Sequence, residues 1–268
     1  MKKMIAIALA MLMLFGMIAC GQTAQTETTA PEQTGEQTTT EAATLQTVNE
    51  GKLTMSTNAQ FPPYEMVTDN GDFEGIDVEI AAAIAEKLGL ELQVDDMEFA
   101  AALEAAQQGK SDIVMAGVTV TDERLQVMNF STSYANGVQV VIVKEGSDIT
   151  LDNLGEKMIG TQAGTTGYIY CSEDFGEDHV TAYETGATAV QALVNGQVDC
   201  VVIDNMPAQE FVKANAGLTI LDTEYANENY AIGMAKDNTA LLDAINNALA
   251  ELTADGTIAQ IVNKYIPA

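Results

Sequence analysis

The sequence is poor in several residue types, and the shortage of basic residues is the most informative. Its 268 residues include no tryptophan, one histidine and three cysteines, and only 11 lysines and arginines accompany 39 acidic residues. The formal net charge of −28 repels phosphate backbones, which excludes a nucleic-acid-binding function. The single histidine, His179, lies in an acidic loop without a cysteine nearby, so we predict no metal site, and no cofactor is indicated.

The three cysteines divide into one near the N-terminus, Cys20, and two in the second half of the chain, Cys171 and Cys200. The spacing of the latter two matches no metal-binding pattern. In an exported chain they could form a disulfide, and two buried thiols are the alternative. The sequence leaves both possibilities open.

The N-terminus reads as an export signal followed by a tether. Two lysines precede an apolar run that is too short and too early for a transmembrane helix, so residues 1–19 are predicted to be a signal peptide. The run ends in Met-Ile-Ala-Cys-Gly, which resembles a bacterial lipobox with Cys20 as the lipidated residue. Residues 20–47 are rich in Thr, Gln and Glu and are predicted to be a disordered tether. We therefore expect an extracytoplasmic protein that lipidated Cys20 anchors to the cell membrane.

Arg124 is the only arginine in the chain, and it lies in the stretch that we expect to bind a ligand. An apolar run over 112–116 predicts a buried strand, followed by a small-residue loop and a helix capped by Thr121. This loop offers free backbone N–H groups, the hydroxyl of Thr119 and a two-pronged guanidinium, which together suit a carboxylate. A surface arginine on an exposed helix is the alternative. Because the lone arginine coincides with such a loop, we favour the binding site.

Apolar periodicity predicts an α/β fold whose two halves echo each other. Strands are predicted over 52–57, 90–94, 112–116, 137–144, 157–161, 199–203 and 230–235, and helices over 75–88, 98–108, 187–194, 206–214, 239–252 and 257–265. A Gly-x-x-Asp turn precedes a buried strand in each half, at Gly109 and at Gly196. Ligands bind at the carboxyl ends of strands in such sheets, so the loops near Thr119 and Asp204 could face a common cleft.

Several motifs together resemble the extracellular solute-binding proteins of polar amino-acid ABC importers. They run in the family's order from about residue 50 to 266, which is the whole globular part. The matching segments are Phe-Pro-Pro-Tyr-Glu at 61–65, Gly-Ile-Asp-Val-Glu-Ile-Ala at 75–81, Gly-Lys-Ser-Asp at 109–112, Gly-Val-Thr-Val-Thr-Asp-Glu-Arg at 117–124, Ala-Gly-Thr-Thr-Gly at 163–167 and Asp-Gly-Thr at 255–257.

The resemblance implies a two-lobe periplasmic-binding-protein fold of type II, hinged by two crossing strands. Residues 48–139 and 233–268 would form lobe 1, and residues 140–232 would form lobe 2. The crossing strands would lie at 138–143 and 230–235. Such a protein captures a free amino acid between its lobes and delivers it, as a monomer, to the transmembrane subunits of an ABC permease.

The resemblance also assigns roles to individual residues. Arg124 and Thr119 would clamp the ligand α-carboxylate with help from the N–H of Thr166. Asp204 would accept the α-ammonium together with the Gly117 carbonyl. The residues themselves point the same way, because a zwitterion needs a fixed cation and a fixed anion that lose water when the lobes meet. For Asp204, capping of the helix that follows is the local alternative.

Four further residues bear on the ligand side chain. Phe61 and Phe99 resemble the aromatic walls that sandwich the ligand in this family, and ordinary core packing is the alternative. Basic amino-acid binders often carry Asp where Asn58 stands, and glutamine binders can carry Lys where Gln162 stands. Two neutral amides at these positions indicate a ligand with a polar or uncharged side chain.

Two other functions compete with transport. An enzyme on the same fold, similar to cyclohexadienyl dehydratase, would need a general acid or base with a tuned pKa in the cleft. The sole histidine is poorly placed for this, and no carboxylate pair stands out in the sequence, so we expect no enzymatic activity. A ligand sensor for a membrane receptor would use the same binding chemistry as a transport protein.

Overall fold

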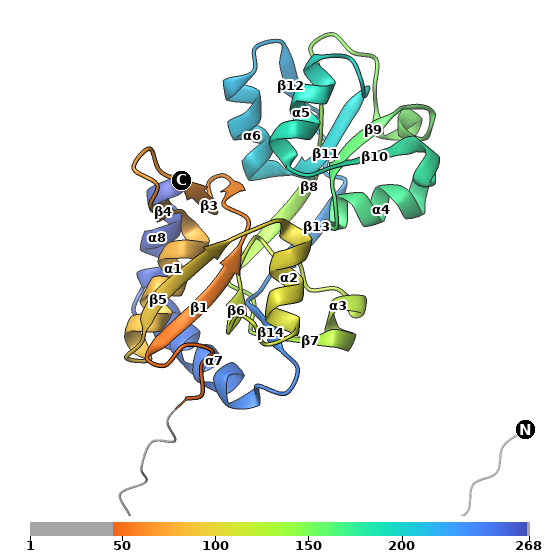
Figure 1. Cartoon of the computed structure of the whole chain (residues 1–268). Helices are drawn as coiled ribbons and strands as arrows, with labels where there is room; N and C mark the ends of the chain where they lie inside the picture. The colour runs from red at the N-terminus through yellow and green to blue at the C-terminus, as the bar shows by residue number, and fades with distance from the viewer. Residues whose placement is uncertain (1–44, 267–268) are drawn as a thin grey trace, which may run out of the picture. The chain divides into compact units, whose positions relative to one another are not determined.

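The computed structural model describes residues 45–266, and two helix-covered β-sheets organise this part of the chain (Figure 1). One sheet has the strand order β5-β1-β6-β14-β7, and we call the part built on it the first lobe. The other has the order β10-β9-β11-β8-β12, with β13 also paired to β8, and we call that part the second lobe. This mixed α/β architecture confirms the predicted fold class. The expected signal peptide and Cys20 lie outside the described residues.

The first lobe contains both the beginning and the end of the described chain. Its central strands are β1 (Lys52–Thr57), β5 (Glu91–Asp96), β6 (Ile113–Val114), β7 (Met128–Phe130) and β14 (Gly233–Ala235). Its helices are α1 (Ile76–Lys87), α2 (Phe99–Gln107), α3 (Asp122–Val127), α7 (Thr239–Ala254) and α8 (Thr257–Tyr265). A small antiparallel sheet consists of β2 (Gln60–Phe61), β3 (Glu65–Val67) and β4 (Phe73–Glu74).

The second lobe is a continuous stretch between the two crossings. Its strands are β8 (Ala135–Lys144), β9 (Ile159–Gln162), β10 (Val180–Tyr183), β11 (Cys200–Asp204), β12 (Leu218–Ile220) and β13 (Ala226–Tyr230). Its helices are η1 (Leu151–Glu156), α4 (Thr166–Phe175), η2 (Glu177–His179), α5 (Gly186–Val194) and α6 (Asn205–Ala214).

Parallel pairing places the carboxyl ends of strands from each sheet at an edge where loops can reach a ligand. In the first lobe β1 pairs in parallel with β5 and β6, and in the second lobe β9 pairs in parallel with β10 and β11. The chain leaves β1 at Asn58, β9 at Gln162 and β11 at Asp204. Three of the predicted site residues therefore stand at these strand ends.

Two antiparallel segments connect the lobes. β8 pairs along β13, with Gln139 opposite Ala226 and Ala135 opposite Tyr230. The single strand that we predicted over 230–235 is divided in the structure, because β13 ends at Tyr230 and β14 begins only at Gly233. The change of partner explains the break: before it the chain pairs with the second sheet, and after it with the first.

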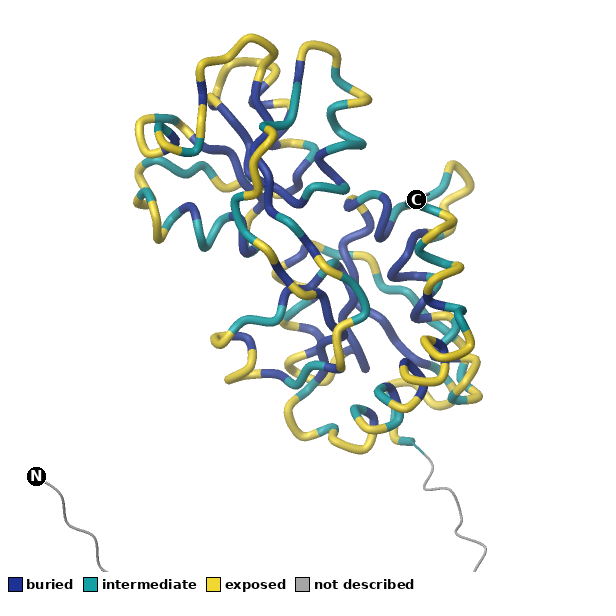
Figure 2. The backbone as a smooth tube through the Cα atoms, turned by 180° about the vertical axis from the view of Figure 1, so that it is seen from behind, coloured by how far each residue is buried: buried dark blue, intermediate teal, exposed yellow. Residues whose placement is uncertain are grey.

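Buried side chains fill both lobes and the crossing between them. Figure 2 shows the buried strands in the middle of each lobe and exposed residues on the outer helices and loops. One cluster contains residues of both lobes, from Met55 and Ile80 to Val201 and Ile203. Burial of this shared apolar surface favours contact between the lobes.

The second lobe has a smaller core of its own, in which Cys171 of α4 and Cys200 of β11 both pack. Both cysteines are buried free thiols, so of the two possibilities left open by the sequence the structure has the unpaired one. Burial raises the pKa of each thiol to about 12. Within residues 45–266, no helix has the length and apolar character needed to cross a bilayer.

Candidate functional site

A pocket with an empty volume of about 330 Å³ lies between the two lobes. Its lining includes all nine residues that the sequence analysis named as ligand-binding. The first lobe contributes Asn58, Phe61, Glu65, Phe99, Ala116, Gly117, Thr119 and Arg124, and the second contributes Gln162, Thr165, Thr166 and Asp204.

Arg124 is buried, with 9% of its surface exposed, and its guanidinium is held by backbone carbonyls rather than by a carboxylate. Thr121 caps α3 by accepting the Arg124 N–H at 3.2 Å, as the sequence predicted. Nη1 donates to the Thr119 carbonyl at 2.8 Å, and Nη2 donates to the Gly164 carbonyl of the second lobe at 3.1 Å. Burial lowers the pKa of Arg124, and Glu228 opposes this shift. A guanidinium has five N–H groups, so further donors remain for a ligand.

The N-terminus of α4 forms part of the second lobe's contribution. The Thr165 hydroxyl accepts the Tyr168 N–H at 3.4 Å and donates to the Gln162 carbonyl at 2.8 Å, which fixes the turn between β9 and α4. Thr166 is the first helical residue and is buried. Backbone N–H groups in a first helical turn have no partner within the helix, and the dipole makes this end attractive to anions.

Asp204 ends β11 and is 8% exposed. It occupies the N-cap position of α6, but its side chain makes no capping hydrogen bond. Instead, Oδ2 accepts from Gln139 Nε2 at 2.8 Å, and Oδ1 accepts from the Tyr230 hydroxyl. Burial, followed by the charge of Glu228, raises the pKa of Asp204 to about 7. The local alternative of a side-chain cap is therefore not what the structure shows.

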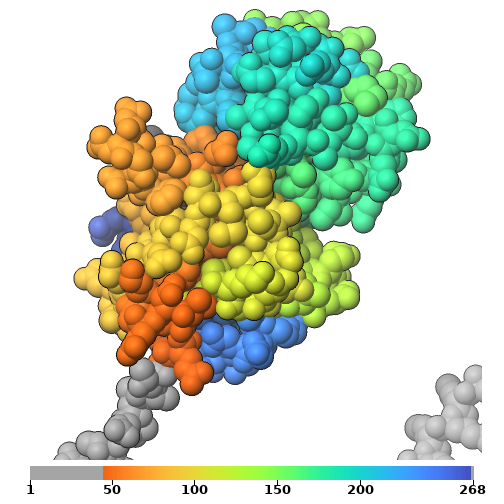
Figure 3. Space-filling model, viewed as in Figure 1, coloured from red at the N-terminus to blue at the C-terminus, as the bar shows by residue number. Residues whose placement is uncertain are grey.

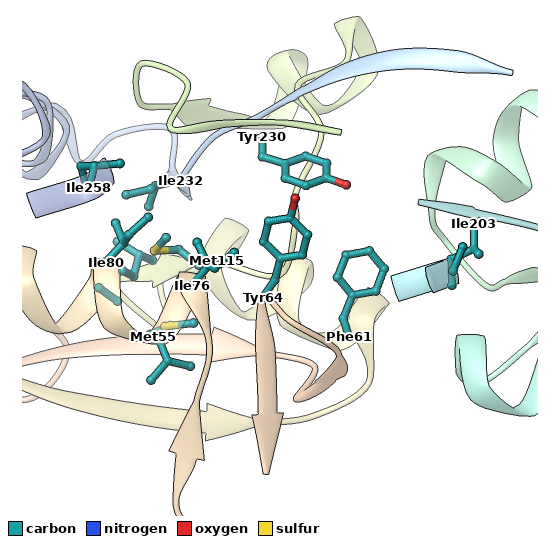
Figure 4. Close-up of a cluster of buried hydrophobic side chains, with 14 of the residues drawn as sticks. Met55, Phe61, Tyr64, Ile76, Ile80, Met115, Ile203, Tyr230, Ile232 and Ile258 are labelled. Carbon is teal, nitrogen blue, oxygen red and sulfur yellow. The ribbon is translucent and has the colours of Figure 1, made fainter. Parts of the chain in front are cut away.

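Aromatic rings line the first lobe's side of the pocket. Phe61 lies 5.8 Å from Tyr64 between ring centroids, and Figure 4 shows both rings beside Tyr230, with Ile203 across from Phe61 (Figure 4). Gly117 has a φ of +56°, and a Cβ there would lie 2.8 Å from a Phe61 ring carbon, so only glycine allows this approach. The Phe99 ring centroid lies 5.5 Å from the Arg124 guanidinium carbon, a cation–π geometry.

The two amides Asn58 and Gln162 contact each other across the lobes. Gln162 Nε2 donates to Asn58 Oδ1 at 2.9 Å, and Asn58 Nδ2 donates to the Met97 carbonyl at 2.9 Å. On the face shown in Figure 3, yellow atoms of the first lobe meet green and teal atoms of the second without a gap (Figure 3). With the Arg124–Gly164 bond, this amide pair links the lobes directly over the pocket.

Sequence reasoning missed several polar residues at or beside the pocket. Glu65 lines it and is fully buried, although the sequence analysis quoted it only as part of a motif. Gln139 Nε2 donates to Glu228 Oε2 at 2.9 Å as well as to Asp204, so this amide bridges the carboxyl groups of β13 and β11. Nothing in the sequence separates Glu65 and Glu228 from the other 37 acidic residues, because only the fold buries them.

Comparisons with known proteins agree on one family. The family model described as bacterial extracellular solute-binding proteins, family 3, matches residues 53–268. The ABC transporter arginine-binding protein 1 of Escherichia coli is 30% identical over 221 residues, covering 81% of this chain and 91% of that protein. A solved structure of an ancestral arginine-binding protein bound to arginine is 38% identical with a TM-score of 0.75, covering 80% of this chain and 98% of that one. The structure of an ancestral arginine-binding protein bound to glutamine is 36% identical with a TM-score of 0.78, covering 82% of this chain and 100% of that one.

Proposed function

This chain belongs to the bacterial extracellular solute-binding proteins, family 3, and from that membership we propose that it captures a basic α-amino acid for an ABC permease. The observation that carries the proposal is the pair of buried opposite charges, Arg124 and Asp204, which line one pocket from different lobes. Neither is in contact with a charged protein group of opposite sign among the described residues. A free zwitterion supplies the missing partner to both.

In the proposed complex the α-carboxylate lies between Arg124 and the N-terminus of α4. The guanidinium donates in a bidentate fashion, and the Thr119 hydroxyl and the Thr166 N–H complete the clamp. The two Arg124 bonds to the Thr119 and Gly164 carbonyls support this assignment, since they fix the fork while leaving donors free. The α-ammonium lies against Asp204 and the Gly117 carbonyl. A positive charge there favours the ionised form of Asp204.

For the ligand side chain we replace the expectation of a polar or uncharged group by a basic one, with arginine as the first candidate. That expectation rested on Asn58 and Gln162. These two amides form a hydrogen bond with each other, so each has one fewer bond to offer a ligand. The carboxyl groups of Asp204 and Glu228, at and beside the pocket, outnumber the single guanidinium. A net positive ligand compensates this excess, and Phe61 and Phe99 offer faces to a planar cation. The arginine named for the relatives supports the same choice.

A thermal-shift screen against the twenty amino acids, followed by calorimetry, tests this proposal. A ligand that binds only the folded state raises its melting temperature, and we expect arginine to give the largest rise, followed by lysine or histidine. Glutamine is the matched neutral comparison, because an ancestral relative is named with it bound. A larger shift with glutamine than with arginine would contradict the basic side chain but keep amino-acid binding. No shift with any amino acid would contradict both.

The relatives support binding over the two other functions considered. They are named as amino-acid-binding proteins, so the chain is a binding protein and not a dehydratase. We further propose that Cys20 is lipidated and anchors a monomer outside the cytoplasm, where it delivers its ligand to permease subunits rather than to a receptor. A Cys20→Ala variant is expected to leave the membrane fraction for the medium or the periplasm. Retention of that variant in the membrane would contradict the anchor.

A further inference from the structure

Three buried carboxyl oxygens at or beside the pocket have no hydrogen-bond donor within the part of the chain that the structure describes. Both oxygens of Glu65, in β3, lack an N–H or O–H partner among the described residues, and so does Oδ1 of Asp77, in α1. Both side chains are 0% exposed. Buried polar atoms in folded proteins nearly always have a hydrogen-bond partner, so three unpartnered oxygens in one place require an explanation.

The other oxygen of Asp77 is fully used. Oδ2 accepts the Gly117 N–H at 2.9 Å and the Tyr134 hydroxyl at 2.8 Å. The carboxyl groups of Glu65 and Asp77 also lie within hydrogen-bonding reach of each other. Two ionised carboxylates have no proton to place between them, whereas one neutral acid donates its O–H to the other.

We propose that Glu65 and Asp77 share one proton, and that this pair positions Gly117 for ligand binding. Glu65 donates, Asp77 accepts, and Asp77 in turn accepts the Gly117 N–H, which holds the backbone of Gly117 on the N-terminal side of its carbonyl. The functional half of the inference rests on the proposed function, in which the Gly117 carbonyl accepts the ligand ammonium. Glu65 and Asp77 are then positioning residues, because they act through Gly117. The same pair also holds Tyr134, which lies next to the crossing strand β8.

The surroundings favour a neutral Glu65. The charged groups that act on it are Asp77, Asp204 and Asp96, all acidic, and Tyr64 and Tyr134 are the neutral hydroxyl-bearing neighbours of the pair. Burial, followed by the charge of Asp77, raises the pKa of Glu65. Burial also raises the pKa of Asp77, to about 6, against the Gly117 and Tyr134 hydrogen bonds that lower it. The proton therefore resides on Glu65, since Asp77 holds the donors that stabilise a negative charge.

Two substitutions of similar size test whether Glu65 acts as a hydrogen-bond donor or only fills space. Glu65→Gln keeps the shape and donates an N–H to Asp77, so we expect its affinity for the cognate amino acid to stay within about threefold of the wild type. Glu65→Leu keeps the bulk and removes the donor, so we expect an affinity loss of about tenfold or more. In ¹H–¹⁵N spectra the Gly117 amide resonance should keep its position in Glu65→Gln and move in Glu65→Leu. Equal affinity and equal Gly117 shifts in the two variants would overturn the positioning role.

The proton itself is tested without any ligand. A buried neutral carboxyl has an infrared C=O band at higher frequency than a carboxylate, and the wild type should show one near neutral pH that Glu65→Gln lacks. This test remains available if Glu65→Leu fails to fold. Absence of a difference between the wild type and Glu65→Gln would overturn the shared proton. If no amino acid binds the wild type, the proposed function fails. The infrared band and the Gly117 resonance still show in that case whether Glu65 and Asp77 share a proton.

Discussion

Each wall of the pocket holds a buried ionisable side chain, and the two side chains are of opposite charge type. The first lobe presents a buried cation, Arg124, held by the carbonyls of Thr119 and Gly164. The second lobe presents a buried carboxyl, Asp204, held by the Gln139 amide and the Tyr230 hydroxyl. In both cases neutral dipoles keep the group in place without cancelling its charge. An internal ion pair would have satisfied both groups and left less for a ligand to gain.

The walls differ in what surrounds these charges. The first lobe adds the rings of Phe61 and Phe99, whereas the second adds the threonines and free N–H groups at the start of α4. Neither wall alone offers a charged side chain of opposite sign to both ends of an amino acid, because Arg124 lies on one wall and Asp204 on the other. Ligand contacts that exist only when the lobes meet are what shifts such a protein toward its closed state. The comparison predicts that damage to either charge weakens binding, but with a different pH dependence.

The largest expected effect comes from removing the cation. Arg124→Ala should weaken binding of the cognate amino acid by about 2–5 kcal/mol, which is about 30-fold to several thousand-fold, because the carboxylate is left buried and unpaired. Calorimetry measures the loss directly. Arg124→Lys is the matched control, since it keeps the charge but not the bidentate fork. Its affinity should lie between those of the wild type and Arg124→Ala. Unchanged affinity in Arg124→Ala would remove the clamp assignment.

A smaller loss, with a diagnostic pH profile, is expected from the carboxyl on the opposite wall. The pKa of Asp204 is raised to about 7 in the unliganded protein, and a bound ammonium favours the ionised form. Binding then releases a proton, so wild-type affinity should rise as the pH increases from about 5 to about 7. Asp204→Asn should bind about tenfold or more weakly and show a flatter profile in this window. Identical profiles for the two proteins would argue against an Asp204–ammonium contact.

The smallest loss of affinity is expected at the uncharged contact between the two lobes, the hydrogen bond from Gln162 to Asn58. Gln162→Ala removes the hydrogen bond to Asn58, which is worth about 1 kcal/mol. Affinity should fall about fivefold, and small-angle scattering should report a larger radius of gyration for the unliganded protein, as the open form gains population. Thr188→Ala, a change on α5 outside the pocket lining, serves as a control for both measurements. A loss as large as that of Arg124→Ala would mean that the amide, and not the charge, dominates.

Much of the fold could be predicted because local patterns and tertiary packing agree. The expected strand over 52–57 is β1, and the fourfold apolar spacing over 75–88 is α1, which buries Ile76, Ile80 and Ile84. The strand expected over 112–116 is shorter in the structure, where β6 covers only Ile113–Val114. After it the chain turns toward the pocket, so residues that look like strand in sequence serve as lining instead.

The candidate site also combines residues that local sequence signals identify with residues whose role depends on tertiary contacts. Arg124 was found because it is the only arginine and follows a loop with a recognisable helix cap, both of which are local signals. Glu65 was missed as a site residue because its carboxyl becomes unusual only when α1 brings Asp77 beside it. The expectation of a polar or uncharged ligand side chain also leaves out a tertiary contact. That expectation treats Asn58 and Gln162 as independent amides, whereas the two contact each other across the lobes, and local sequence patterns give no sign of such a contact.

By itself the sequence determined the class of the fold, the family and the position of the one guanidinium, because periodicity, caps and ordered motifs act over a few neighbouring residues. Only the tertiary structure decided which acids are buried, which thiols stay apart and which amide faces which. Those outcomes depend on segments far apart in the chain meeting in a space that excludes water. Burial of this kind changes the energy of a charge far more than any sequence neighbour does.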